Sequence, residues 1–203
     1  ETAMTRLTAA SQAQLDANTD LLKIASAAMG FEANSLRIMA RRPAILKGFM
    51  ALSAAILGPD GLIDPGLRQM IAHVTSKAAG CKYCQAHTAH SAVHRGLSTE
   101  KIEALWAFES HPLFSPAERA ALQLAQAAGS VPNQATDENF RQLELYYSGD
   151  EIAEIVAVIA LFGFLNRWND TLATDIEDSP LAFAEAHLKH SDFTIPETDK
   201  AKL

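Results

Sequence analysis

The sequence has few cysteines, no segment at its start with the pattern of a secretory leader, and no excess of basic residues. Two cysteines among 203 residues are too few for the disulfide framework of a small secreted protein. The start, ETAMTRLTAASQ, lacks a basic segment followed by an apolar run, so we expect no signal peptide. The formal net charge of −7 disfavours nucleic-acid binding, which needs a basic face. We therefore expect a cytoplasmic protein with no nucleic-acid partner.

Long apolar runs are also missing. The longest extends from Ile152 to Leu165 and is interrupted by Glu154. A helix that spans a bilayer needs about 20 apolar residues, so we expect no membrane partner and interpret this run as a buried helix. The segment from Glu151 to Leu165 is apolar over more than one face, which predicts packing against a second copy and a homo-oligomer.

Helical periodicity extends over almost the whole chain, and no segment alternates polar and apolar residues as a strand would. We therefore predict an all-α fold with a single helical domain at 18–190, preceded by an N-terminal segment (1–17) and followed by a C-terminal tail (191–203). The predicted helices cover 20–29, 35–40, 43–57, 65–80, 81–95, 98–108, 116–129, 137–147, 150–170 and 179–190.

Both cysteines and two of the seven histidines lie in the stretch GCKYCQAHTAH, residues 80–90. The spacing C-x2-C-x2-H-x2-H resembles a zinc site, but all four side chains would lie on one helix. Such a helix rises about 13 Å over nine residues, whereas zinc–ligand bonds are about 2.0–2.3 Å. The four residues cannot share one ion, although two of them with ligands from elsewhere stay possible. A structural disulfide would close only a small ring and add little stability.

A redox-active dithiol is the favoured interpretation of this stretch. Gly80 interrupts the preceding helix and places Cys81 and Cys84 in the first turn of the next, where the helix dipole and unpaired N–H groups favour a thiolate. One thiol can resolve a sulfenic acid formed on the other. His87, one turn after Cys84, is placed to exchange a proton with it. Two buried, inert cysteines remain the alternative.

The run LRQMIAHVTSKAAGCKYCQAHTAHSAVHRGLSTEKIEAL resembles the core of the AhpD-like, carboxymuconolactone decarboxylase superfamily, and its peroxidase-related branch in particular. The similarity extends from about Asn18 to Leu172 and includes PAILKGFMALSAAILGPDGLIDPGLR and GFLNRWND. The resemblance implies an oligomeric AhpD-like helical bundle that reduces alkyl hydroperoxides without a cofactor and is re-reduced by a thiol or dithiol protein. It also implies Cys84 as the peroxide-attacking thiol and Cys81 as the resolving thiol.

The chain departs from the proton relay of this family, which uses a Glu twelve residues before the first Cys and a His four residues after the second. Gln69 and Thr88 occupy these positions, and neither side chain titrates in a useful range. The nearest substitutes are His87 and His73, since a histidine that titrates near neutrality can act as a general base. His90 is a further possible relay residue, and for His73 and His90 an ordinary structural role stays open.

Asn166 to Asp170 end the otherwise apolar helix with the sequence NRWND. These residues are either a polar helix end with Trp168 in an interface or, in line with the family, a pocket wall near the dithiol.

Three functions follow as hypotheses. The first is a cofactor-free thiol peroxidase in which Cys84 attacks, Cys81 resolves, His87 assists deprotonation and Gln69 orients the site by hydrogen bonds. The second is a lyase or isomerase that acts on a lactone, as on the decarboxylase side of the superfamily. The third is a non-enzymatic dithiol redox protein. Only the first and third use the two sulfurs.

Overall fold

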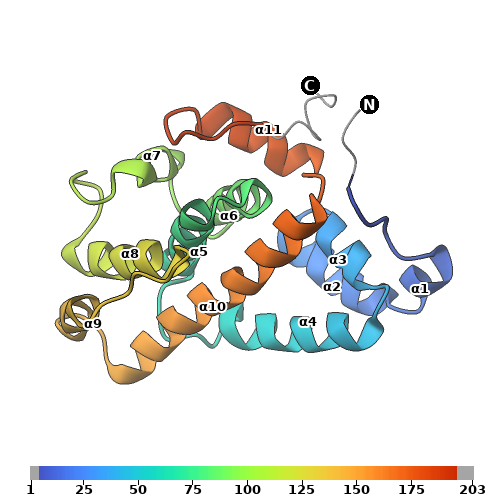
Figure 1. The fold of residues 1–203 in the computed structure, drawn as a ribbon, viewed down its shortest axis with the longest axis horizontal. Helices are drawn as coiled ribbons and strands as arrows, with labels where there is room; N and C mark the ends of the chain where they lie inside the picture. The colour runs from blue at the N-terminus through green and yellow to red at the C-terminus, as the bar shows by residue number, and fades with distance from the viewer. Residues whose placement is uncertain (1–4, 196–203) are drawn as a thin grey trace.

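The computed structural model describes residues 5–195, and this part of the chain contains helices and connecting segments but no strand (Figure 1). The all-α prediction is confirmed. The helices are α1 (Gln12–Asp16), α2 (Thr19–Met29), α3 (Asn34–Met39), α4 (Pro43–Leu57), α5 (Pro65–Ala79), α6 (Lys82–His94), α7 (Thr99–Glu103), the 3-10 helix η1 (Leu105–Ala107), α8 (Pro116–Gly129), α9 (Asp137–Glu144), α10 (Gly149–Leu172) and α11 (Asp178–His187).

Helix α5 is the centre of the fold. The Asp64 side chain caps it by accepting a hydrogen bond of 3.0 Å from the Leu67 amide, and proline occupies its first position. Every residue from Gly66 to Ser76 is buried, because α6, α8 and α10 all contact this helix. Helix α5 is therefore the buried element against which the neighbouring helices pack.

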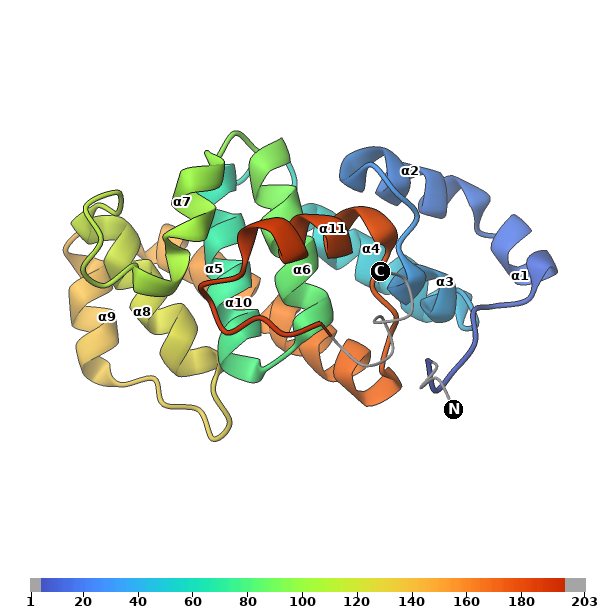
Figure 2. The ribbon, with the colours of Figure 1, turned by 90° about the horizontal axis from the view of Figure 1, so that it is seen from above.

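The other helices form layers around this centre. Helix α10 crosses α5 and contacts α4 and α6 as well, and α11 crosses over α6 (Figures 1 and 2). Apolar side chains from α5, α6, α8, α10 and α11 make up the main core, while α2, α3 and α4 enclose a smaller one. The long helix α10 thus connects both cores and brings its last turns next to the start of α6.

Most helix ends lie at the glycine, proline and capping residues where the sequence predicts them. Helix α4 has the predicted bounds, and α2 and α5 end at Gly30 and Gly80, each with a left-handed φ of 83°, which glycine adopts without a steric cost. Ser115 forms the predicted capping box with Glu118 at the start of α8.

Several details differ from the prediction. The helices predicted at 137–147 and 179–190 end three residues earlier, at Glu144 and His187. The helix predicted from Ser98 to Phe108 is divided into α7 and the 3-10 helix η1. The N-terminal segment 1–17, for which no helix was predicted, contains α1, which begins with a capping box between Ser11 and Gln14. That signal is present in the sequence, but the helix it starts is only five residues long. Of the predicted tail 191–203, residues 196–203 lie outside the described part.

Glu154, the acidic residue that interrupts the apolar run, has a structural role. Its carboxylate accepts hydrogen bonds from the amides of Leu62 (2.6 Å) and Ile63 (3.3 Å) and lies 3.7 Å from the buried Arg68 guanidinium. Glu154 therefore fixes the connection between α4 and α5 against α10. Within residues 5–195, no helix has the length and apolar character needed to cross a bilayer.

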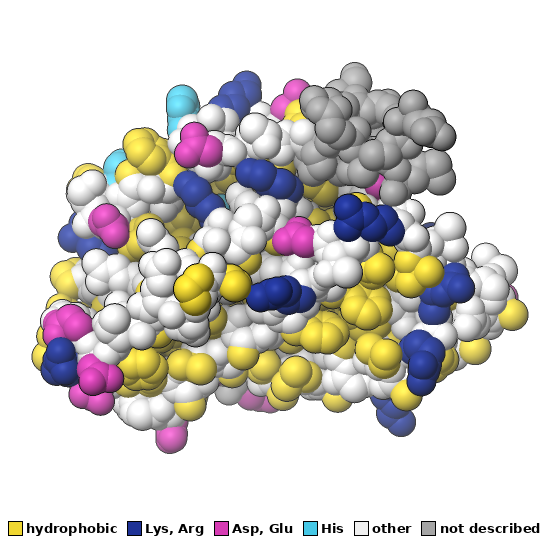
Figure 3. Space-filling model, viewed as in Figure 1, with side chains coloured by type: hydrophobic (Ala, Val, Ile, Leu, Met, Phe, Trp, Pro, Cys, Tyr) yellow, Lys and Arg dark blue, Asp and Glu magenta, His cyan; other side chains and the backbone are white. Residues whose placement is uncertain are grey.

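An apolar surface follows α4 and α10, and we call it the α4–α10 face. Its exposed members are Ile45 and Leu52 on α4 and Val156 and Phe164 on α10. Phe164 stacks on Phe49 at a ring-centroid distance of 5.8 Å. Figure 3 shows hydrophobic side chains gathered over the part of the molecule formed by these helices. The oligomer predicted from the sequence is not visible in a single chain.

Candidate active site

The two cysteines lie at a junction shared by two helices. Gly80 ends α5, and the Cys81 amide donates a hydrogen bond of 3.0 Å back to the Ser76 carbonyl, as in a Schellman motif. Cys81 is also the N-cap of α6, since its sulfur accepts a hydrogen bond of 3.4 Å from the Cys84 amide. The predicted placement of both sulfurs in the first turn of a helix is therefore correct.

Both cysteines are reduced and buried, with exposed fractions of 0% for Cys81 and 2% for Cys84. A hydrogen bond with the Cys84 side chain raises the pKa of Cys81, and burial and the negative charges of Cys84 and Asp170 raise it further. The expectation that the helix start acidifies both thiols is therefore wrong for Cys81. The surroundings of the two sulfurs differ: the Cys81 sulfur accepts a hydrogen bond from the Cys84 amide, whereas the Cys84 sulfur has a side-chain partner on another helix.

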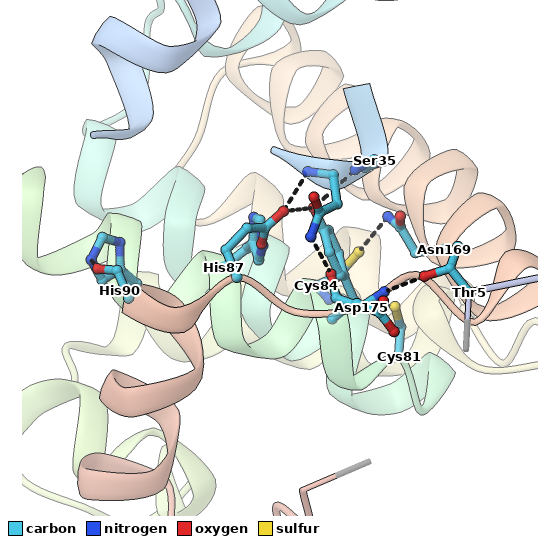
Figure 4. A network of polar contacts seen from close by, with 12 residues as sticks. Thr5, Ser35, Cys81, Cys84, His87, His90, Asn169 and Asp175 are labelled. Atoms are coloured by element: carbon cyan, nitrogen blue, oxygen red, sulfur yellow. Dashed lines mark hydrogen bonds and ion pairs between the residues drawn. The ribbon is translucent and has the colours of Figure 1, made fainter. Parts of the chain in front are cut away.

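Asn169, from the last turns of α10, contacts the Cys84 sulfur directly (Figure 4). Its Nδ2 lies 3.6 Å from Cys84 Sγ and 3.0 Å from the Leu165 carbonyl oxygen. An N–H group directed at sulfur stabilises the thiolate over the thiol. The interpretation of the NRWND segment as a wall beside the dithiol therefore fits the position of Asn169.

His87 lies one turn after Cys84, but its ring is bound to Glu177. The His87 Nε2 and a Glu177 carboxylate oxygen are 2.5 Å apart, and the imidazole stacks on the Tyr83 ring at a centroid distance of 4.0 Å. The Phe31 ring meets the imidazole edge-on at a centroid distance of 5.0 Å. The ring orientation is therefore fixed by Glu177 and by two aromatic neighbours.

Glu177 is the residue that sequence reasoning missed. It precedes α11 and accepts hydrogen bonds from the Tyr83 hydroxyl (2.9 Å) and the Asn34 amide in addition to His87. Burial raises the pKa of Glu177, but the charge of His87, its hydrogen bond and the Asn34 amide together lower it below the usual value. No local pattern could reveal this role, because the partners lie about 90 and 140 residues away in sequence.

His73 and Thr88 form a buried chain of hydrogen bonds behind the dithiol. The Thr88 hydroxyl donates to the Cys84 carbonyl at 2.7 Å, and His73 Nδ1 lies 3.1 Å from both Thr88 Oγ1 and the Gln85 carbonyl. Burial lowers the pKa of His73 to about 4, opposed in part by the hydrogen bond to the Gln85 carbonyl. The expectation that His73 titrates near neutrality is therefore wrong, and the neutral ring positions Thr88 and the first turns of α6.

The buried His73 predicts a loss of stability on mild acidification. Its folded pKa of about 4 lies below the unfolded value of about 6.5, so the unfolded chain binds the proton first and stability falls between these two pH values. We expect a decrease in the free energy of unfolding of about 2 kcal/mol from pH 7 to pH 5, measured by urea denaturation. His73→Asn should remove most of this slope and His190→Gln, at an exposed position, should retain it. An unchanged slope in His73→Asn would contradict the assignment.

Gln69 and His90 are not joined to the sulfurs by hydrogen bonds. Gln69 is buried on α5, one turn before His73, and the hydrogen bonds found among the described residues include none between its side chain and either cysteine. His90 lies two turns beyond Cys84 (Figure 4), where its Nε2 is 2.9 Å from the Ser179 hydroxyl. Within residues 5–195, no group of three His, Cys, Asp or Glu side chains is arranged to hold a metal ion.

Comparison with known families covers the part of the chain that carries the dithiol. The carboxymuconolactone decarboxylase family model matches residues 43–127, which include α5, α6 and both cysteines. The chain belongs to the AhpD-like, carboxymuconolactone decarboxylase superfamily, as the resemblance in its sequence predicts.

Solved structures agree with this assignment. A cysteine-to-alanine variant of the debrominase Bmp8 in complex with 2,3,4-tribromopyrrole is 31% identical, with a TM-score of 0.85 over 92% of this chain and 99% of that chain. An uncharacterized peroxidase-related protein with an AhpD core from Ralstonia eutropha JMP134 is 23% identical, with a TM-score of 0.77 over 90% and 96% of the two chains. The second likeness shows the fold alone.

Curated relatives match only in part. The uncharacterized protein YnjA of Escherichia coli (strain K12) is 27% identical over 110 residues, which are 54% of this chain and 60% of YnjA. The chain thus spans less than two thirds of the length of this relative.

Proposed function

We propose that the protein is a cofactor-free dithiol reductase that transfers two electrons from Cys84 and Cys81 to a small electrophilic substrate. The observation that carries this proposal is the asymmetry of the pair. The Cys81 sulfur is the N-cap of α6, where a hydrogen bond with the Cys84 side chain, burial and nearby negative charges raise its pKa, whereas the Cys84 sulfur accepts a hydrogen bond from the Asn169 amide. One sulfur is thereby set up as the nucleophile and the other as the resolving thiol.

An alkyl hydroperoxide is the first substrate class that we propose. The Cys84 thiolate attacks the terminal peroxide oxygen, the O–O bond breaks, and the alkoxide leaves with a proton as an alcohol. Cys81 then attacks the sulfenic acid on Cys84, which releases water and forms the disulfide. A thiol or dithiol protein returns two electrons and two protons to the pair. His87, whose ring is positioned by Glu177, supplies a proton relay in place of the missing family residues.

A halogenated heteroaromatic compound is the second substrate class, and the 31% identity to the debrominase Bmp8 over almost the whole chain favours it. A thiolate that attacks bromine breaks the C–Br bond, and the ring carbon takes a proton. Cys81 then displaces bromide from the Cys84 sulfur and forms the same disulfide. This reaction consumes the same two electrons, so the dithiol chemistry is common to both classes.

Steady-state turnover with a dithiol reductant tests the proposal. Reduced protein is mixed with dithiothreitol and either cumene hydroperoxide or 2,3,4-tribromopyrrole, and loss of substrate is followed together with free thiols. We expect catalytic consumption of one of the two substrates and reversible loss of both thiols. Loss of both thiols without turnover would indicate the non-enzymatic redox protein. Lactone conversion by a variant that lacks both cysteines would indicate the lyase or isomerase.

The burial of the sulfurs adds a kinetic expectation. Because both cysteines are almost inaccessible, a substrate reaches Cys84 only when neighbouring segments move, so alkylation should be limited by this opening. We expect iodoacetamide to react with native Cys84 at least about tenfold more slowly than with the unfolded chain. Equal rates in the native and unfolded protein would contradict the buried arrangement. A cytoplasmic location, where thiols stay reduced, is part of the proposal.

A homo-oligomer formed through the α4–α10 face is also proposed. The exposed side chains of Leu52 and Phe164 lie on two adjacent helices, and such a face can pack on its copy about a two-fold axis. We expect size-exclusion chromatography with light scattering to show a dimer or a larger species at micromolar concentration. Leu52→Glu with Phe164→Glu should give a monomer, while Ile24→Glu, which changes an exposed residue of α2, should not. A monomeric wild type would refute this part.

A further inference from the structure

The buried face of α10 changes from apolar to polar where it reaches the dithiol. Ile155 and Phe162 continue this face toward the C-terminus, and Asn166 and Asn169 follow at helical spacing. The helix contacts α5 and α6, and Asn169 lies against Cys84. Two carboxamides thus occupy core positions one turn apart on this face, and that of Asn169 contacts the reactive sulfur.

Most of the hydrogen-bonding capacity of these carboxamides is unused. Asn166 and Asn169 are 2% and 1% exposed. Nevertheless, three of their side-chain atoms lack a hydrogen-bond partner: Nδ2 and Oδ1 of Asn166 and Oδ1 of Asn169. The buried Nε1 of Trp168 lacks one as well. Because an unpaired buried polar group costs as much free energy as a lost hydrogen bond, these atoms call for a partner from outside the chain, and a polar ligand beside the sulfur would supply one.

The charges around the sulfurs favour a neutral ligand. Asp170 is the charged side chain that acts on Cys81, and its charge is negative. Among residues 5–195, no cationic side chain hydrogen bonds to either sulfur or to the two asparagines. An anionic substrate would therefore meet a carboxylate and a thiolate without the Arg or Lys that anion sites use.

We propose that Asn166 and Asn169 form a substrate subsite beside Cys84, which takes a neutral molecule with an O–H or N–H donor next to its electrophilic atom. The inference rests on the proposed dithiol reduction. The Asn169 oxygen accepts the hydrogen bond of the substrate donor, and the Asn166 amide donates to the acceptor atom of the same substrate. A hydroperoxide carries its O–H on the oxygen that is attacked, and a bromopyrrole carries its N–H in the ring that bears bromine.

Binding to a variant that cannot react tests the subsite. Cys84→Ala with Trp106→Phe retains Trp168 as its only tryptophan, so fluorescence follows binding beside the asparagines. Cumene hydroperoxide is compared with dicumyl peroxide, which lacks the O–H, and 2,3,4-tribromopyrrole with its N-methyl derivative. We expect about tenfold tighter binding of the donor-bearing member of one pair. The pair of compounds that shows this preference indicates whether the substrate is a hydroperoxide or a bromopyrrole.

Variants of the asparagines separate binding from packing. Asn166→Leu and Asn169→Leu should abolish the tenfold preference, whereas Asn18→Leu, at another buried asparagine, should retain it. Asn166→Leu should also raise the thermal unfolding midpoint by roughly 3 °C, because an unpaired amide is replaced by an apolar group. A lower midpoint would show that the Asn166 amide has a structural partner, and would overturn the inference for this residue.

The test also distinguishes the subsite from the reaction. If the wild type forms the disulfide but the asparagine variants retain the preference for the donor-bearing ligand, the subsite is wrong and the dithiol reduction stands. If the wild type forms no disulfide with either substrate while the preference and its loss are observed, the subsite stands and the proposed reaction is wrong.

Discussion

Cys84→Ser is expected to abolish turnover, with a decrease in kcat/KM of about a thousandfold or more. Serine retains the size and position of the side chain, but its hydroxyl is not ionised near neutral pH and is a poor nucleophile toward peroxide or bromine. Because Cys84 is 2% exposed, the substitution adds no surface charge and should leave the fold intact. Circular dichroism and the consumption of cumene hydroperoxide or 2,3,4-tribromopyrrole measure these two effects.

Cys81→Ser is the matched control, because it removes the second sulfur and retains the first. Cys84 can then react once, so we expect one equivalent of substrate to be consumed without dithiol-dependent turnover. With a hydroperoxide, the protein should gain the mass of one oxygen atom on Cys84 before slower over-oxidation. The reverse pattern, with a single turnover in Cys84→Ser and none in Cys81→Ser, would exchange the roles of the two cysteines.

Glu177→Ala is expected to lower the free energy of unfolding by about 3 kcal/mol, because the loss of one partner leaves buried donors unpaired. The change removes the acceptor for the Tyr83 hydroxyl, the Asn34 amide and the His87 ring, and with it the polar connection of α3, α6 and α11. Urea denaturation at pH 7 measures this loss.

Glu185→Ala is the control for this prediction, since Glu185 is an exposed residue of α11 and its loss should change stability by less than about 0.5 kcal/mol. Glu177→Gln preserves the side-chain shape and should recover part of the stability. In this variant we also expect a lower kcat, because His87 loses its negatively charged partner. An unchanged kcat would assign Glu177 to stability alone.

The sequence determined the helices well because their ends are encoded locally. Pro43 starts α4, Asp64 caps α5, and Gly30 and Gly80 supply the left-handed residues that end α2 and α5. These signals involve residues no more than four positions apart, so no tertiary information is needed. The helix predicted from Ser98 to Phe108 is divided into two pieces, because no comparable local signal marks the end of α7 at Glu103.

Only the part of the candidate site formed by neighbouring residues at the start of α6 could be predicted from the sequence. The spacing of Cys81 and Cys84 and the position of Gly80 predict two neighbouring sulfurs at a helix start, which the structure contains. The environment of the histidines could not be read in the same way. His73 is neutral because α5 is buried on every side, and His87 is held by Glu177, which lies 90 residues further along the chain.

At the junction after Gly80, the redox state of the two cysteines should affect a backbone hydrogen bond. Cys81 takes part in two hydrogen bonds, one from its amide to the last turn of α5 and one from the Cys84 amide to its sulfur. A bond between the two sulfurs would change the acceptor of the Cys84 amide, because that acceptor is the Cys81 sulfur. The hydrogen bond from the Cys81 amide to α5 would stay in place. Deuterium uptake at the Cys84 amide should therefore differ between the oxidised and reduced protein, while uptake at the Cys81 amide should serve as an internal reference.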